Sequence, residues 1–104
     1  MGEKFLVGAK NEFESGKAVK FVAGATRIAI VRIGEDFYAL GDRCSHADIS
    51  LSEGEVYCDE RELECWKHGS TFSLKTGKPT TLPATRAVPT YEIQVEDGKV
   101  WVTL

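Results

Sequence analysis

Two short motifs, each joining a cysteine to a histidine, constrain this 104-residue chain more than any other feature. The first is C-x-H, at Cys44 and His46, and the second, after eighteen intervening residues, is C-x2-H, at Cys65 and His68. They use both histidines of the chain and two of its three cysteines. Two thiolates and two imidazoles form a donor set that suits zinc or an iron–sulfur cluster. A fold that uses all four must bring two separate segments to one metal site.

Each motif supplies one sulfur and one nitrogen, and this distribution bears on the kind of metal. A zinc finger with two cysteines and two histidines usually takes both thiolates from one segment and both imidazoles from the other. The arrangement here suits a two-iron cluster, in which each loop contributes its cysteine to one iron and its histidine to the other. A single zinc ion in a structural or interaction module stays open as an alternative. A thiol enzyme, which needs a reactive cysteine, is another.

Strand patterns occupy the sequence before the first motif. β-Branched and apolar residues fill 18–22 and 27–33, and the short apolar segment 37–40 follows. Turns that contain glycine separate the three segments, at 24–26 and 34–36. The pattern predicts a three-stranded meander.

Further strands alternate with the motifs. The segments 55–58 and 62–65 flank a polar hairpin loop, and 70–74 runs into a turn that contains Gly77. We expect Cys58, the cysteine outside the motifs, to be a buried strand residue that acts as a small hydrophobe. Three prolines fall within 79–89, which we therefore predict to be a stiff loop, because proline lacks the N–H that a central strand donates.

The end of the chain predicts a β-hairpin. Segments 91–95 and 99–104 alternate apolar and polar residues around Asp97-Gly98, a dipeptide suited to a type I′ turn. The apolar face would hold Ile93, Val95, Val100 and Val102. No window has a sustained helical period, although 11–16 or 46–52 could form a single helical turn. The fold class is therefore all-β, a small barrel or sandwich in a single domain.

Composition excludes several classes of function. Apolar residues make up 42% and charged residues 28%, which are values typical of globular proteins. The formal charge of −3 and the absence of a lysine and arginine cluster argue against a nucleic-acid partner. Since we find neither a membrane-spanning run nor a signal peptide, we expect a cytoplasmic protein with no membrane association. We also expect a monomer.

The motifs and their surroundings resemble the Rieske iron–sulfur family, and specifically its small ferredoxins. The likeness rests on C-x-H and C-x2-H at this separation, followed by Gly69-Ser70, Phe72, the sequence TGKP and the proline-containing LPA. It implies an antiparallel β-sandwich or barrel base with a small two-loop subdomain at approximately 44–84, within a single Rieske domain at 1–104. It also implies that Cys44, His46, Cys65 and His68 bind one [2Fe-2S] cluster.

The resemblance also implies which residues tune the cluster. High-potential Rieske proteins have an additional pair of cysteines and donate Ser and Tyr hydroxyls to the cluster sulfurs. Here Ser70 matches the serine, Phe72 stands in place of the tyrosine, and Pro83 belongs to the proline loop that covers the cluster in the family. Neutral imidazoles raise the potential above that of all-cysteine ferredoxins, so we expect a value of about −150 to 0 mV, in the lower part of the Rieske range.

The function that follows from the resemblance is one-electron transfer. The partners would be a flavin-dependent reductase and a terminal oxygenase or similar acceptor, with Trp66 and Lys67 as candidate docking residues. A Rieske subunit that serves nitrite reductase or iron–sulfur assembly is the alternative within the family. We expect no catalytic residues, because both histidines are used by the cluster and none remains for a mononuclear iron site.

Overall fold

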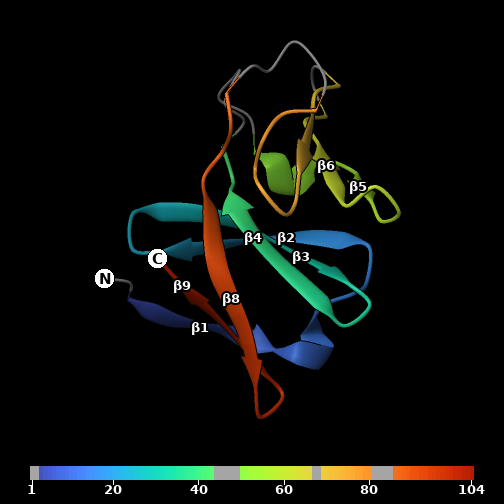
Figure 1. Cartoon of the computed structure of the whole chain (residues 1–104). Coiled ribbons are helices and arrows are strands. Elements are labelled where there is room, and N and C mark those ends of the chain that lie inside the picture. The colour runs from blue at the N-terminus through green and yellow to red at the C-terminus, as the bar shows by residue number, and fades with distance from the viewer. Residues whose placement is uncertain (1–2, 44–49, 67–68, 81–85) are drawn as a thin grey trace.

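The computed structural model describes residues 3–43, 50–66, 69–80 and 86–104. The strands in these residues form two antiparallel sheets (Figure 1), in the orders β1-β9-β8-β4-β3-β2 and β5-β6-β7. The strands are β1 (Lys4–Ala9), β2 (Lys17–Ala23), β3 (Thr26–Ile33), β4 (Asp36–Gly41), β5 (Val56–Tyr57), β6 (Glu62–Glu64), β7 (Thr71–Ser73), β8 (Thr90–Glu96) and β9 (Lys99–Thr103). Two single turns of 3₁₀-helix, η1 (Lys10–Glu12) and η2 (Leu51–Glu53), fall near the predicted helical turns. The all-β class is confirmed.

The predicted meander is the centre of the larger sheet. β3 pairs with β2 on one side and with β4 on the other, both antiparallel. Gly24 and Gly34, in the two connecting turns, have φ values of +62° and +60°, a conformation that glycine adopts without steric cost. The sheet curls into a half-barrel that we call the base, and the three-stranded sheet lies at one end of it (Figure 1).

β3 is buried on both faces and therefore separates two hydrophobic cores. Because successive side chains of a strand point to opposite faces, Ile28 and Ile30 join one core while Ala29 and Val31 join the other. The base core consists of Phe13, Ala23, Ile28, Ile30, Phe37, Ala39, Val100 and Val102. The upper core consists of Ala29, Val31, Ile33, Leu40, Leu51, Leu63, Cys65, Phe72, Leu74 and Val88.

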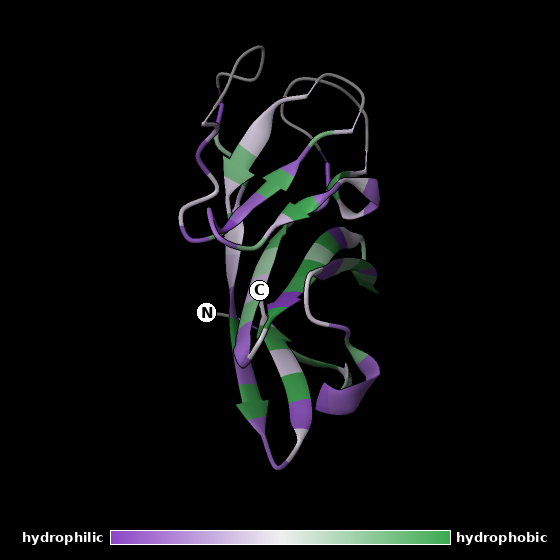
Figure 2. Ribbon diagram, turned by 90° about the vertical axis from the view of Figure 1, so that its right-hand side faces the viewer, coloured by the Kyte–Doolittle hydropathy of each residue, from purple (hydrophilic) through white to green (hydrophobic). Residues whose placement is uncertain are grey.

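The C-terminal hairpin forms as predicted. Asp97 and Gly98 both have positive φ, 52° and 73°, as a type I′ turn requires. Figure 2 shows hydrophobic and hydrophilic residues alternating along this hairpin, the lowest in the view. Val95 pairs with Val100 and Ile93 pairs with Val102, so the four apolar residues share one face as predicted. Val100 and Val102 are buried, whereas Val95 is 39% exposed. Val95 lies two residues before the Asp97-Gly98 turn.

β1 is a strand that the sequence analysis missed. It pairs antiparallel with β9, with an irregularity between Leu6 and Gly8. Phe5 and Val7 alternate toward the base core, while Leu6 is exposed. The alternation is short, and the pairing with the opposite end of the chain is what makes the segment a strand.

The second sheet confirms the strands predicted around the second motif, with one correction. β5 ends at Tyr57, so Cys58 lies in the following turn and is half-buried instead of fully buried. Its side chain still packs against the upper core. The described ends of 79–89 contain no strand, in agreement with a proline loop. In the described part of the chain, no helix is long and apolar enough to cross a membrane.

Alanine at Gly77 should destabilise the protein more than alanine at Gly98. The two glycines have φ values of +74° and +73°, so each change should cost about 1–2 kcal/mol for the left-handed conformation. At Gly77 the added Cβ would also lie 2.1 Å from the carbonyl oxygen of Val88, whereas nothing lies within 4 Å at Gly98. We expect G77A to lose a further ~1–3 kcal/mol in urea unfolding followed by tryptophan fluorescence. Equal losses in the two variants would contradict the tight contact between 77 and 88.

Candidate metal centre

One of the four predicted cluster ligands, Cys65, lies within the described residues. Cys44, His46 and His68 lie outside them, as do Lys67 of the candidate docking pair and Pro83 of the proline loop. The described residues contain no group of three or more histidine, cysteine or acidic side chains that could hold a metal ion. Of the predicted centre, the structure shows Cys65 and the segments that border the other three predicted ligands.

The second motif begins directly after β6, and β7 follows it at Thr71. The last strand pair is Glu64 with Thr71, and beyond it the N–H of Cys65 donates to the carbonyl oxygen of Ser70 at 2.6 Å. The N–H of Gly69 donates to the carbonyl oxygen of Cys65 at 2.9 Å, and Gly69 has a φ of +74°. Two backbone hydrogen bonds thus close a short loop around the motif. Cys65 is fully buried and forms no disulfide.

The first motif follows the end of β4. The N–H of Leu51 donates to the carbonyl oxygen of Asp42 at 2.5 Å, and Arg43 and Ser50 form an isolated antiparallel bridge. The carboxylate of Asp42 reaches the same end of the segment, where it accepts a hydrogen bond from the N–H of Ser52 at 2.8 Å. Cys44 and His46 therefore belong to a segment whose two ends are joined by backbone and side-chain hydrogen bonds.

The described ends of both loops belong to one packed unit. Leu51, after the first motif, and Cys65, at the start of the second, are both buried in the upper core. The chain turns back closely here, because a Cβ at Gly54 would lie 1.6 Å from the carbonyl oxygen of Glu64. The N–H of Glu64 also donates to the carbonyl oxygen of Glu55 at 2.9 Å. The fold brings the borders of the two motifs to the same end of the molecule (Figure 1).

The proline segment is attached to this same unit. Beside β7, the N–H of Thr80 donates to the carbonyl oxygen of Thr71 at 2.7 Å, and the N–H of Ser73 donates to that of Lys78 at 2.9 Å. After the loop, the N–H of Val88 donates to the carbonyl oxygen of Gly77 at 2.8 Å. Both described ends of the proline loop are thus anchored next to the hairpin that contains Cys65.

The predicted tuning residues that the structure describes are buried. Ser70 and Phe72 are both fully buried, on the strand side of the hairpin loop. The Phe72 ring packs in the upper core with Leu63 and Cys65, so this position supplies an apolar surface and no hydroxyl. Trp66, by contrast, is 51% exposed next to the buried Cys65.

Acidic groups border the outer side of the small sheet. The hydroxyl of Tyr57 donates to Oε2 of Glu64 at 2.8 Å. This hydrogen bond raises the pKa of Tyr57, and burial and the nearby charges of Glu64, Glu55 and Glu60 act in the same direction. Tyr57 therefore stays a neutral hydrogen-bond donor under ordinary conditions.

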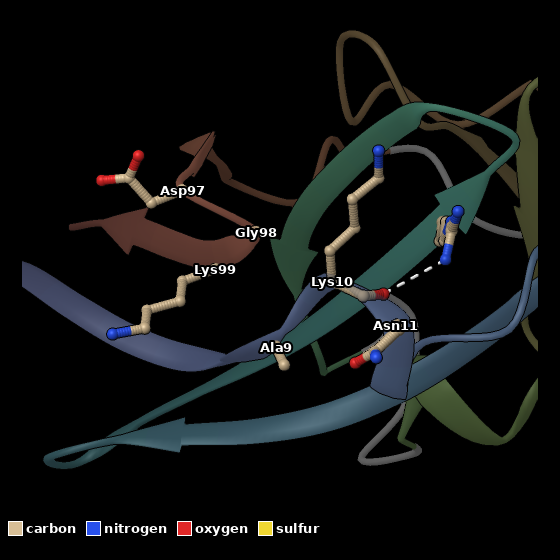
Figure 3. Close-up of a pocket in the computed structure, with 7 residues that line it drawn as sticks. Ala9, Lys10, Asn11, Asp97, Gly98 and Lys99 are labelled. Carbon is tan, nitrogen blue, oxygen red and sulfur yellow. Dashed lines mark hydrogen bonds between the residues drawn. The ribbon is translucent and has the colours of Figure 1, made fainter.

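A hollow of about 530 Å³ lies far from these loops, beside the turn of the C-terminal hairpin (Figure 3). Two of the cations that line it have structural contacts, and of these Arg32 donates to the carbonyl oxygens of Lys10 and Phe13 at 3.1 and 2.9 Å. Lys10 forms an ion pair with Glu35. Of the predicted ligands and docking residues, the structure describes Cys65 and Trp66, and neither of them lines this hollow.

The sequence analysis did not single out Asp42. The sequence signal that could have indicated Asp42 was an acidic residue at the end of a strand, followed by serines at 50 and 52. Sequence patterns do not reveal that such a carboxylate is buried, because the strand alternation ends at Gly41.

Known proteins with similar sequences include ferredoxins of dioxygenases. The 3-phenylpropionate/cinnamic acid dioxygenase ferredoxin subunit of Escherichia coli strain K12 is 46% identical over 77 residues, covering 74% of this chain and 72% of that protein. The solved ferredoxin of carbazole 1,9a-dioxygenase from Nocardioides aromaticivorans IC177 superposes with a TM-score of 0.93 at 29% identity, covering 95% of both chains.

A second solved structure is a complex of reduced oxygenase and oxidized ferredoxin in carbazole 1,9a-dioxygenase. One of its chains is 35% identical with a TM-score of 0.88, and the match covers 95% of this chain and 91% of that one. The profile of the Rieske [2Fe-2S] domain matches residues 3–92 of the present sequence. With nearly the whole chain matched, this protein belongs to the Rieske [2Fe-2S] domain family.

Proposed function

We propose that this protein is the ferredoxin component of a multicomponent dioxygenase system. It would take one electron from a flavin-dependent reductase and pass it to a terminal oxygenase. The observation that carries the proposal is the similarity, over most of the chain, to the ferredoxin subunits of two dioxygenases. The complex of oxygenase and ferredoxin supports direct contact between two such components.

We assign the cluster ligands to Cys44, His46, Cys65 and His68, within a subdomain at approximately 44–84 of a single Rieske domain. The donor set fits a [2Fe-2S] cluster, since thiolates and imidazoles are the ligands of the Rieske centre. Support comes from Cys65, which is buried, free of a disulfide and held in a closed loop. When bound, the cluster accepts and releases a single electron.

The upper core would keep Cys65 in place and exclude water from it, and the hydrogen-bonded loop ends would limit the freedom of both motifs. Residues whose rotamers and backbone are already held by packing lose little freedom when a cofactor binds. Phe72 adds apolar surface here and leaves the sulfurs without the tyrosine hydroxyl of high-potential Rieske proteins. The chain also has no additional cysteine pair, since its third cysteine, Cys58, stands alone. We therefore propose a cluster of low potential.

We infer that the protein oxidises no substrate by itself. Both histidines of the chain are assigned to the cluster. A mononuclear iron site of two histidines and one carboxylate would need further imidazoles. Turnover would therefore require the oxygenase partner.

The cluster assignment is tested by a matched pair of cysteine variants. Freshly purified protein should be red-brown, with two irons and two acid-labile sulfides per chain, as a [2Fe-2S] cluster requires. Cys65→Ser should lose the chromophore, because the serine hydroxyl is a poor replacement for a thiolate ligand. Cys58→Ser, a change at the half-buried cysteine outside the motifs, should keep it. A colourless protein with one zinc per chain would replace this assignment with the structural zinc module.

The potential is tested by redox titration of the wild type and of Phe72→Tyr. The wild type should titrate at about −150 to 0 mV, and a midpoint above about +100 mV would contradict the low-potential assignment. The tyrosine variant restores a hydroxyl donor, which should raise the midpoint by about 40 mV if the net hydrogen bond is worth roughly 1 kcal/mol. Phe72→Leu, which adds no hydroxyl, is the control for changed packing.

We further propose that Trp66 and Lys67 contact the redox partner. Trp66 exposes an aromatic ring directly beside a ligand, and such residues often contribute most to binding at interfaces. Trp66→Ala should lower kcat/KM for this protein about tenfold in a reconstituted assay of reductase, ferredoxin and oxygenase, with an unchanged midpoint potential. Val22→Ala, at a residue that is 54% exposed on β2, is the matched control. Equal effects of the two substitutions would show that Trp66 does not contribute to binding of the partner.

A further inference from the structure

Asp42 is a carboxylate buried at the border of the first ligand loop. It is the one fully buried acidic residue in the described part of the chain, directly after β4. A carboxylate taken out of water is costly unless hydrogen-bond donors replace the solvent. The burial of the Asp42 carboxylate therefore needs a structural or an electrostatic explanation.

The contacts of Asp42 join the two ends of the loop. Its Oδ2 accepts a hydrogen bond from the hydroxyl of Ser50, and its Oδ1 accepts one from the N–H of Ser52 at 2.8 Å. The two serine hydroxyls are 2.9 Å apart. On the main chain, the N–H of Asp42 donates to the carbonyl oxygen of Arg27 at 3.0 Å, which ties the same residue to the base. We call this set of contacts, made by Asp42, Ser50 and Ser52, the clasp.

Asp42 is also close to the assigned ligand Cys44. Two residues of fully extended chain span at most about 7 Å, so the two Cα atoms are within that distance. Charges in a poorly solvated interior interact more strongly than charges in water. A negative charge at this distance would oppose the addition of an electron to the cluster.

We propose that Asp42 is a positioning residue of the cluster site, which clasps the first ligand loop and lowers the electron affinity of the centre. The inference rests on the proposed function, because it assumes that Cys44 and His46 are ligands. The clasp fixes the ends of the loop, and the buried charge makes the reduced protein a stronger electron donor. Two features of one side chain, its hydrogen bonds and its charge, can therefore be tested separately.

The charge is tested by Asp42→Asn, which keeps the shape and can keep both hydrogen bonds. D42N should shift the equilibrium of one-electron reduction about tenfold toward the reduced form, a rise of about 59 mV in the midpoint. Glu12→Gln is the matched control, because Glu12 is also a carboxylate that accepts a backbone N–H, that of Ala9 at 2.7 Å, but it lies in the base. A midpoint in D42N equal to that of E12Q would overturn the electrostatic part of the proposal.

The clasp is tested by Ser50→Ala, which keeps the charge and removes one hydrogen bond. S50A should lose its cluster at least threefold faster than the wild type in the presence of a chelator, measured by the decay of visible absorbance. Ser15→Ala is the control, since the hydroxyl of Ser15 accepts the N–H of Gly34 at 2.7 Å in a turn of the base. Equal rates in the two serine variants would overturn the clasp. This measurement tests the clasp even if D42N does not fold.

Failure of the proposed function would be visible separately, as wild-type protein without iron and sulfide. The clasp can then be tested in the metal-free chain by amide hydrogen exchange at Leu51 and Ser52. Faster exchange at both amides in S50A than in S15A supports the clasp. Equal exchange overturns it.

Discussion

The two-sided burial of β3 is the constraint on which the rest of this structure depends. Ile28 and Ile30 hold the base core on one face, and Ala29 and Val31 hold the upper core on the other. Since a strand cannot shift register by one residue without exchanging its two faces, the position of the upper core is tied to that of the base. The hairpin that contains Cys65 and the turn that contains Leu51 both pack on this upper core, so a β-sheet that contains no predicted ligand positions the described borders of the candidate metal site.

Backbone hydrogen bonds hold the loops that the upper core positions. Each loop with predicted ligands is closed at its ends, Asp42 to Leu51 in one case and Cys65 to Ser70 in the other. The proline segment is joined to the same hairpin through Thr71 and Thr80. A carrier that only gains and loses an electron benefits from such a site, because its ligands need not rearrange between the two oxidation states.

Much of the fold could be predicted from local patterns. The meander of β2, β3 and β4 follows from β-branched runs separated by glycine turns, and the Asp97-Gly98 turn has the two positive φ angles that its type demands. Burial was harder to predict, because it depends on neighbours from distant parts of the chain. Val95 lies on the predicted face but is 39% exposed, and Cys58 lies one residue past the end of its strand. β1 becomes a strand through its pairing with β9.

The sequence by itself determined the donor chemistry of the candidate site, because cysteine and histidine at C-x-H and C-x2-H define the possible ligands whatever their surroundings. It also determined the all-β class, because a period of two and glycine-rich turns are local properties. Only the tertiary structure decided that Asp42 is buried and bonded to Ser50 and Ser52, that Phe72 fills the core beside Cys65, and that Trp66 faces solvent. These features depend on how separate segments of the chain pack against one another, and local sequence patterns do not specify that packing.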